Sequence, residues 1–355
     1  MKVLITNLTM AERSGTVIVT RDICLTLKNL GHFPLVYTSR IGPVADELRA
    51  QGVPVVSDIT KIEEVPDVIH GHHTLETATA ALYFPHTPAI FVCHDFTAWH
   101  DVAPRLANIV HYAAISHTFR RRLTAQDGIH PDATSVVLNG VDTDRFLLGP
   151  ALPEIPRRAL IFVKSEQHLR VVQAACDLAE IHLDAVGSSV GVVIDRPEDI
   201  IVGYDLIFTS ALNAMECIVA GRAVIVCDGR GLAGFATLAR YDAWRAENFG
   251  VPIFDKRLTV DAVRAEIDNF DRVEAVQVSQ RLRHDANLQA WTASYLEIYR
   301  SAISRFQRPD ANAVGRSGAG FLQQWSPLRL PAAWLAERDA LREQIDRLTA
   351  CLDCT

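Results

Sequence analysis

Residues 2–31 read KVLITNLTMAERSGTVIVTRDICLTLKNLG and contain the pattern that decides the fold. The run over residues 2–6 is short, apolar and rich in β-branched residues, which predicts a buried strand. A turn at Ser14-Gly15-Thr16 follows, and over residues 17–30 apolar side chains recur at helical spacing until Gly31 ends the pattern. This segment is therefore predicted to form a strand, a glycine-containing loop and a helix.

The same alternation of strands and helices continues through both halves of the chain. Further strands are predicted at residues 33–37, 53–56, 68–69, 90–93, 159–163, 182–186, 205–208 and 223–227, and helices at 44–51, 75–83, 167–179 and 211–220. This rhythm indicates right-handed βαβ units and parallel sheets covered by helices on both faces. The predicted fold class is α/β, with two Rossmann-like domains.

The length and the loops divide the chain into four predicted parts. Its 355 residues exceed what one ordinary core fills, and the proline-rich stretch 150–156 suits a linker between domains at 1–150 and 151–306. An apolar stripe over residues 287–305 predicts a long helix that closes the second domain. Residues 307–331 have the composition of a flexible linker, and 332–355 that of an amphipathic C-terminal helix through which two chains can pair.

Composition excludes several classes of protein. Hydrophobic residues make up 49% of the chain and charged residues 22%, as in a globular protein with a sizeable core. A net charge of −7 provides no basic field for nucleic acid. We expect no transmembrane segment and no secretory signal, and hence a cytoplasmic protein, with peripheral attachment to the inner face of a membrane left open.

Seven cysteines are scattered through the sequence, mostly inside apolar runs. Buried free thiols in a reducing compartment are the expected arrangement. The alternative is confined to the end of the chain, where Cys351-x-x-Cys354 has the spacing of a redox or metal pair.

The string Val136-Val-Leu-Asn139-Gly140-Val141-Asp142-Thr-Asp-Arg-Phe146 precedes the linker. Taken alone, Asn139-Gly140 favours a turn after a strand, and Asp142 can cap the turn that follows. The string also resembles the Asn-Gly-Val-Asp-x-x-x-Phe signature of glycosyltransferase family 4. Members of that family have the GT-B fold, in which the active site lies between two Rossmann-like domains.

Other segments agree with the family in the expected order. They are Ser14-Gly15-Thr16, Gly31-His32, Pro66-Asp-Val-Ile-His70, Val92-Cys-His94-Asp95 and Ala114-Ile-Ser116. The resemblance runs in good register to about residue 146 and more weakly to about residue 306. It implies that Gly15 and Thr16 belong to the donor-binding loop.

In the second half, Tyr204-Asp-Leu-Ile-Phe-Thr-Ser210 followed by Ala214-Met-Glu216 resembles the donor-site segment of the family. Amides at the predicted helix start can hold a diphosphate without a net positive charge on the protein. Glu216 can accept hydrogen bonds from a ribose or sugar hydroxyl, and a buried structural carboxylate is the alternative. The predicted donor-binding residues of this segment are Ser210, Ala211, Leu212 and Asn213.

The donor half also departs from the family pattern. The first glutamate of the usual Glu-x7-Glu pair falls on Phe208, so only Glu216 remains. The usual Gly-Arg-Leu and Lys-Gly elements are replaced around Lys164, which becomes the predicted diphosphate cation with Arg170 as second choice. Gly231 lies in a glycine-rich run that resembles the loop after the next strand of the family.

Four histidines suggest two different roles. His70, His72, His73 and His94 can be drawn as a zinc site, but two adjacent histidines rarely bind one ion and no acidic third ligand has metal spacing. We therefore expect no metal. The family resemblance instead implies that His94 contacts the donor sugar or the acceptor hydroxyl.

The predicted function is transfer of a hexose-type sugar from a nucleoside diphosphate sugar to an acceptor hydroxyl, with retention if the family analogy holds. His94, Lys164 and Glu216 are the predicted catalytic residues, and no cofactor is required. The partners are a nucleotide sugar and a glycan, lipid or protein acceptor. Two alternatives remain: a sugar-nucleotide epimerase of the same fold, and a non-catalytic assembly subunit related to glycosyltransferases.

Overall fold

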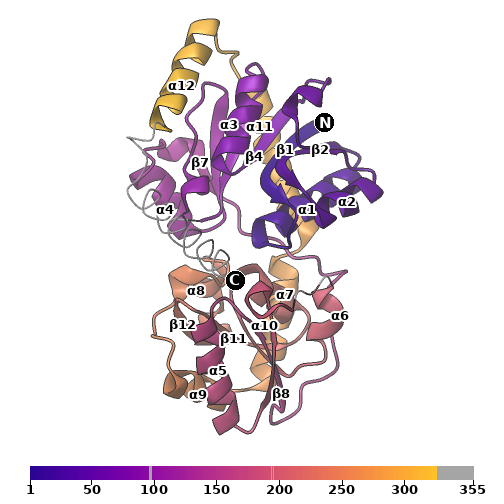
Figure 1. Ribbon diagram of the computed structural model, residues 1–355, viewed down its shortest axis with the longest axis vertical. Helices are drawn as coiled ribbons and strands as arrows, with labels where there is room; N and C mark the ends of the chain where they lie inside the picture. The colour runs from indigo at the N-terminus through magenta and orange to yellow at the C-terminus, as the bar shows by residue number, and fades with distance from the viewer. Residues whose placement is uncertain (96–97, 193, 195, 326–355) are drawn as a thin grey trace, which may run out of the picture.

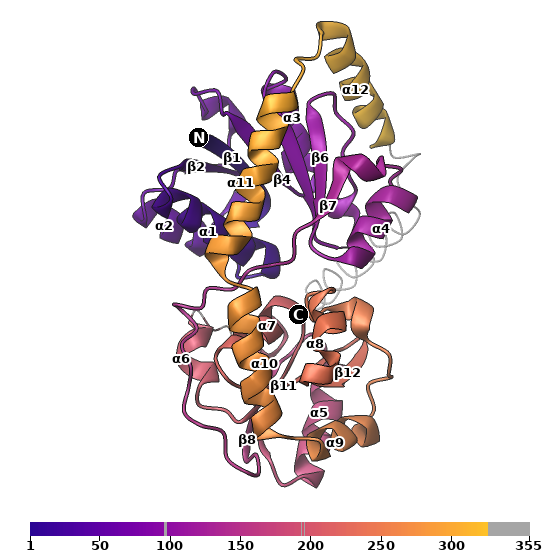
Figure 2. The same cartoon turned by 180° about the vertical axis from the view of Figure 1, so that it is seen from behind.

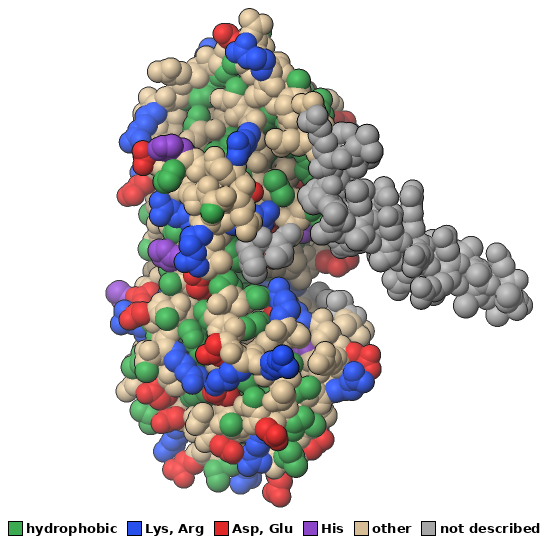
Figure 3. Space-filling view, turned by 90° about the vertical axis from the view of Figure 1, so that its left-hand side faces the viewer, with side chains coloured by type: hydrophobic (Ala, Val, Ile, Leu, Met, Phe, Trp, Pro, Cys, Tyr) green, Lys and Arg blue, Asp and Glu red, His purple; other side chains and the backbone are tan. Residues whose placement is uncertain are grey.

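A computed structural model describes residues 1–95, 98–192, 194 and 196–325 of the chain. Two α/β domains lie one above the other, and each contains its own sheet (Figure 1). On the face shown in Figure 3, acidic and basic side chains are mixed rather than gathered into one broad basic surface. No helix in the described part of the chain combines the length and the apolar character needed to cross a bilayer.

The N-terminal domain is built on a seven-stranded parallel sheet with the order β3-β2-β1-β4-β5-β6-β7. Successive residues of the inner strand β1 point to opposite faces, so Val3 and Ile5 join one apolar core and Leu4 joins another. Both faces of the sheet are therefore covered, as the continuous apolar runs predict. The strands are β1 (Lys2–Met10), β2 (Phe33–Ile41), β3 (Val55–Val56), β4 (Val68–His72), β5 (Ala89–Cys93), β6 (Ile109–Ala114) and β7 (Thr134–Val136).

Four helices of the first half belong to this domain. They are α1 (Gly15–Asn29), α2 (Pro43–Ala50), α3 (Thr74–Tyr83) and α4 (His117–Ala125). Helix α1 starts directly after the loop that follows β1, so its N-terminus lies at the carboxyl end of the sheet. That edge faces the second domain (Figure 1).

The C-terminal domain has a five-stranded sheet with the order β12-β11-β10-β8-β9. Its strands are β8 (Arg158–Phe162), β9 (His182–Val186), β10 (Leu206–Thr209), β11 (Ala223–Asp228) and β12 (Gly231–Phe235). Its helices are α5 (Glu166–Leu178), α6 (Pro197–Ile201), α7 (Ala211–Val219), α8 (Leu238–Arg245), α9 (Val260–Asp268) and α10 (Arg272–Asp285). Strand β12 is antiparallel to β11, which departs from the all-parallel sheet predicted from the sequence.

Helix α11 (Leu288–Arg305) forms where the apolar stripe predicts a helix, but it packs on the N-terminal domain instead of closing the second one (Figure 2). Its fully buried side chains Tyr295 and Tyr299 join the core that contains Val3 and Ile5. The hydroxyl of Tyr299 also lies 2.5 Å from Nδ1 of His70 on β4. A stripe of large aromatic side chains fits this open sheet face, which explains why the chain crosses back.

Residues 311–324 form helix α12 (Ala311–Gln324), so the prediction of a flexible linker is wrong for this part of 307–331. Asp310 caps the helix by accepting a hydrogen bond from the amide of Ala313 at 2.7 Å. Phe321 is buried in the N-terminal domain, and the amide of Ala107 donates to Ser317 Oγ at 3.2 Å. A cap and one aromatic anchor thus outweigh the glycine and serine content. The predicted C-terminal helix at 332–355, with Cys351 and Cys354, lies outside the described residues.

Cys24, Cys93, Cys176, Cys217 and Cys227 are buried and not in disulfides. Burial in apolar surroundings raises the pKa of their thiols, so they act as small core side chains. The prediction of buried free thiols is confirmed for these five residues.

Candidate active site

A cleft of about 780 Å³ lies between the two domains. Residues 11–15 after β1 and the start of α2 form its N-terminal wall. The end of β8, parts of the segment 186–197 after β9 and the first turns of α7 form the opposite wall. The cleft therefore lies at the carboxyl ends of strands from both sheets, where ligands bind in open α/β folds.

The N-terminus of α7 presents backbone amides to this cleft. Leu212 and Asn213 line it, and amides in the first turn of a helix have no acceptor within the helix. Ala211 differs, because it has a positive φ of 56° and its amide donates to the carbonyl of Phe249 at 2.8 Å. Ser210 is the N-cap, and its hydroxyl donates to Asp228 at 3.3 Å. Of the four residues predicted here, the structure places only Leu212 and Asn213 in the lining of the cleft.

Glu216 lines the cleft from the second turn of α7 and is only 6% exposed. Within the described residues its carboxyl group has no hydrogen-bond partner. The pKa of Glu216 is raised to about 8, mainly by burial and also by the nearby Asp22, while Arg13 and Arg145 act in the opposite direction. A buried carboxyl that is mostly protonated near neutral pH can both donate to and accept from a ligand hydroxyl.

Lys164 follows β8 and lines the C-terminal wall of the cleft. Its side chain is exposed, yet the surrounding atoms lower the pKa of the ammonium group, while Asp228 works against that shift. Lys164 and Glu216 therefore share one cleft, as the sequence predicts for two catalytic residues. Arg170, the second-choice cation, is instead an exposed residue of α5 that pairs with Glu166 at 3.7 Å.

Gly15 also lines the cleft, as the first residue of α1. A Cβ atom built on Gly15 would meet nothing within 4 Å. Its neighbour Thr16 is not part of the lining, and its carbonyl accepts a hydrogen bond from the side chain of Asn7 at 3.1 Å. Only one of these two predicted donor-binding residues is therefore in contact with the cleft.

Gly231 lies outside the lining of the cleft, and the glycine-rich run that contains it is not the loop that the family resemblance implies. Residues 231–235 form the buried strand β12, and a Cβ atom on Gly231 would lie 3.0 Å from Cβ of Phe254. Close packing therefore favours glycine at this position. Nothing in the local sequence distinguishes that reason from contact with a ligand.

The four histidines cluster at the ends of β4 and β5, outside the lining of the cleft. Nδ1 of His72 lies 2.6 Å from Nε2 of His94, and the amide of Leu8 donates to Nδ1 of His73 at 3.0 Å. Burial lowers the pKa values of His70 and His94 to about 3, so both rings are neutral near pH 7. Across the described residues, no group of three or more His, Cys, Asp or Glu is arranged to hold a metal ion. Because His94 is outside the lining of the cleft, the structure does not bring it together with Lys164 and Glu216.

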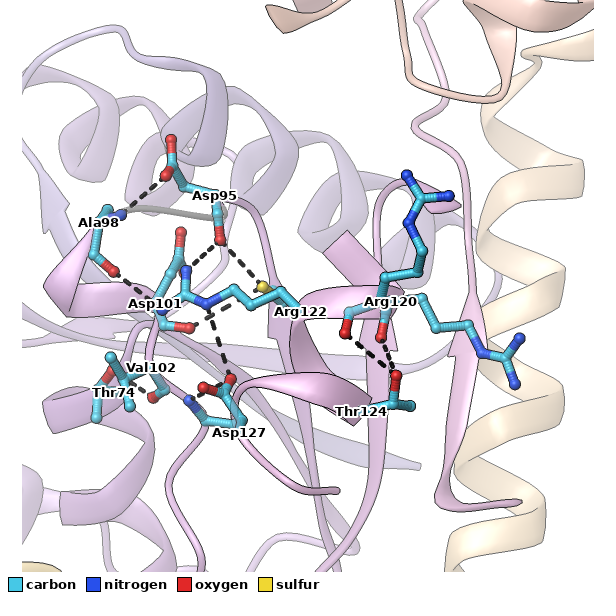
Figure 4. Close-up of polar contacts among 12 residues, drawn as sticks. Thr74, Asp95, Ala98, Asp101, Val102, Arg120, Arg122, Thr124 and Asp127 are labelled. Carbon is cyan, nitrogen blue, oxygen red and sulfur yellow. Dashed lines mark hydrogen bonds and ion pairs between the residues drawn. The ribbon is translucent and has the colours of Figure 1, made fainter. Parts of the chain in front are cut away.

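The loop that carries His94 is held by Arg122 of α4, which is buried (Figure 4). The guanidinium group donates to the carbonyl of Asp95 at 2.5 Å and to that of Ala98 at 3.4 Å. Burial also raises the pKa of Asp101, in the same loop, to about 8, with Asp95 adding to the shift. Arg122 therefore has a structural role in holding this loop, and no sequence motif indicates that role.

The signature around Asn139 lies at the junction between the domains. The amide of Asn139 donates to the side chain of Asn248 at 3.1 Å, and its carbonyl accepts from Arg245 at 2.8 Å. Asn248 also donates to the carbonyl of Ile115. Asp142 accepts from the amide of Arg145 at 2.9 Å, which confirms the predicted turn cap. These contacts hold the domains together, so the signature has a structural role here.

Comparisons with known proteins agree with this architecture. Residues 13–145 match the model of Glycosyltransferase Family 4. No curated protein matches the sequence. The fold is similar to that of HepE from Anabaena in complex with UDP and glucose, with a TM-score of 0.65 and 14% identity over 85% of this chain and 100% of that chain.

Two other solved structures extend the comparison. The catalytic domain of starch synthase IV from Arabidopsis thaliana, bound to ADP and acarbose, has a TM-score of 0.56 and 12% identity over 86% of this chain and 99% of that chain. A protein assigned as a UDP-N-acetylglucosamine 2-epimerase from Listeria monocytogenes has a TM-score of 0.53 and 12% identity over 87% of this chain and 98% of that chain. At these identities the likeness concerns the fold.

The match to residues 13–145 spans α1 to α4 and ends within the Asn139 signature. The similar solved structures extend the agreement to both domains. The chain therefore has the GT-B fold, and residues 13–145 of its N-terminal domain are similar to glycosyltransferase family 4.

Proposed function

We propose that this chain is a glycosyltransferase that moves a hexose-type sugar from a nucleoside diphosphate sugar to an acceptor hydroxyl. The observation that carries the proposal is the set of groups on the C-terminal wall of the cleft. A helix N-terminus, the Lys164 ammonium group and the Glu216 carboxyl, which has no hydrogen-bond partner among the described residues, all line one space between two domains. The first two suit a diphosphate and the third suits a hydroxyl.

In this reaction the acceptor oxygen forms a bond to the anomeric carbon as the bond to the diphosphate oxygen breaks. The electron pair leaves with the nucleoside diphosphate, and the acceptor proton passes to the departing phosphate oxygen. Lys164 and the amides of Leu212 and Asn213 stabilise the charge that develops on the leaving group. The family resemblance supports retention of configuration, and the proposal requires neither a metal nor another cofactor.

The proposal places the protein in the cytoplasm, in the synthesis of a polysaccharide or glycoconjugate. Buried free thiols in both domains support a reducing compartment. The acceptor is a glycan, lipid or protein, and the HepE and starch synthase structures, which contain nucleotides and sugars, support a nucleotide sugar as donor.

The test is calorimetry of the full chain with UDP, GDP and ADP sugars, followed by product analysis. Binding of one of them and formation of a glycosylated acceptor are expected. A sugar nucleotide converted to its epimer without any acceptor would favour the epimerase alternative, which the Listeria structure suggests. Absence of binding to the whole panel would contradict the proposal and favour a non-catalytic subunit.

Gly15 provides a steric prediction for the same site. We expect Gly15→Val to weaken UDP binding by about tenfold or more, because the added side chain points into open space at the start of α1, where a phosphate would approach. The free energy of unfolding should change by only about 0.5 kcal/mol, since a Cβ atom there meets no neighbour. Calorimetry and urea denaturation measure the two effects.

Gly315→Val is the matched control, because a Cβ atom on Gly315 also meets nothing within 4 Å and this residue lies in α12. It should leave UDP binding unchanged. Equal UDP affinities for Gly15→Val and the wild type would show that the nucleotide does not approach α1.

A further inference from the structure

Three arginines of the N-terminal domain lie near the interdomain cleft, and they differ in their partners. Arg21 is paired with Asp22 at 2.7 Å and with Glu47 at 2.5 Å. Arg145 is paired with Glu198 at 3.0 Å. Arg13 lines the cleft and has no carboxylate within ion-pair distance among the described residues.

The cleft holds Arg13 in an environment that favours an added anion. Desolvation lowers the pKa of Arg13, and the neighbouring Arg145 adds like-charge repulsion. Two carboxyl groups of the cleft act on Arg13 from beyond ion-pair distance. Glu216 has a pKa of about 8 and is mostly uncharged near neutral pH, and Glu47 is paired with Arg21. Arg13 therefore keeps a positive charge that no direct ion pair within the described residues neutralises.

Arg13 also faces the groups that the proposed function assigns to the donor. It lies two residues before Gly15, the first residue of α1, while Lys164 and the start of α7 lie on the opposite wall of the same cleft. A diphosphate held at α7 carries more negative charge than one ammonium group can balance. A guanidinium group adds a planar pair of donors that matches two phosphate oxygens.

We propose that Arg13 binds the diphosphate of the nucleotide sugar from the N-terminal wall, opposite Lys164. This inference rests on the proposed function. The two cations come from different domains, so the ligand bridges the cleft. Donor binding then stabilises the arrangement in which the walls face each other, and this places the acceptor side against the sugar. The leaving nucleoside diphosphate remains in contact with both cations until it is released.

The experiment is calorimetry of the full chain with inorganic pyrophosphate, UDP and uridine as probes. Arg13→Gln should weaken binding of pyrophosphate and UDP by about tenfold or more, because a charge-assisted hydrogen bond is lost. Uridine affinity should not change. Arg13→Lys keeps the charge and should retain part of the UDP affinity, and the UDP affinity of the wild type should fall more steeply with salt than that of Arg13→Gln.

Arg308→Gln is the matched control. Arg308 is exposed between α11 and α12, and its substitution changes the net charge by the same amount. It should leave all three affinities unchanged. If the wild type binds UDP and Arg13→Gln binds it equally well, the role of Arg13 is wrong while the proposed function stands. If the wild type binds neither pyrophosphate nor any nucleotide, the proposed function itself fails.

Two further outcomes would also overturn the role of Arg13. One is an equal loss of uridine and UDP affinity in Arg13→Gln, which would assign Arg13 to the nucleoside or to the fold. The other is an equal loss of UDP affinity in Arg308→Gln, which would reduce the effect to net charge. If Arg13→Gln does not fold, the comparison of Arg13→Lys with the wild type decides, because a phosphate contact loses bidentate geometry in that variant.

Discussion

Lys164→Ala is expected to lower the turnover of sugar transfer by about 100- to 1,000-fold, the loss typical when one preorganised group that stabilises a developing negative charge is removed. Lys164 lies at the end of β8 in the lining of the cleft, where the surrounding atoms lower the pKa of its ammonium group. The released nucleoside diphosphate, measured at saturating donor, reports this effect. Because the side chain is exposed, the free energy of unfolding should change by only about 0.5 kcal/mol.

Lys61→Ala is the matched control for this variant, since Lys61 is an exposed lysine of the N-terminal domain outside the cleft. It should retain the turnover of the wild type. Lys164→Arg keeps the positive charge and should retain part of the activity. Unchanged turnover in Lys164→Ala would mean that another group stabilises the leaving diphosphate.

The second large effect concerns acid stability and His70. Burial lowers the pKa of His70 to about 3, whereas the unfolded chain has the ordinary value of 6.5. Between these two pH values the unfolded state binds a proton that the folded state does not, so the free energy of unfolding falls as the pH falls. One such histidine contributes about 1.4 kcal/mol per pH unit, which is about 2–3 kcal/mol between pH 6.5 and 4.5.

His70→Gln should therefore make the stability curve flatter on the acid side, because glutamine does not titrate and can still hydrogen-bond to Tyr299. Urea denaturation at pH 6.5 and 4.5 measures the difference for the wild type and the variant. Asp101 and Glu216 have raised pKa values of about 8, so their contribution is lost as the pH rises, but both proteins share it. The difference between the two curves thus reports His70.

His130→Gln is the control for this experiment, since the side chain of His130 is 76% exposed. It should follow the wild-type curve. Parallel curves for the wild type and His70→Gln would indicate that His70 is protonated in the folded protein, or that acid opens the histidine cluster before the domain unfolds.

Local sequence patterns were sufficient to predict most strands and helices, because alternating short apolar runs and helical stripes carry a period. They did not determine which sheet an element joins. The apolar stripe of α11 is compatible with packing on either domain. The helix packs on the N-terminal domain because one face of β4, β5 and β6 is not covered by helices from the first half of the chain. Strand β12 was missed because its glycines also suit a loop, and only its contact with Phe254 distinguishes the two.

The candidate site was predictable to a similar extent. Lys164, Glu216, Leu212, Asn213 and Gly15 line one cleft, as the motifs and the family resemblance suggested. His94 lies outside that lining and contacts His72, and spacing along the chain does not reveal this contact between the ends of two strands. Arg13 was missed because the sequence does not show that this arginine lines the cleft, or that it forms no ion pair within the described residues.

The path of α11 has a consequence for the order in which this protein is made. When a ribosome has completed residue 150, all seven strands of the first sheet exist, but Tyr295 and Tyr299, which cover one of its faces, have not been synthesised. Nascent domains usually fold as units in order from the N-terminus. Here one face of the N-terminal sheet stays uncovered until the whole C-terminal domain has emerged. The N-terminal domain therefore completes its core last, although it is synthesised first.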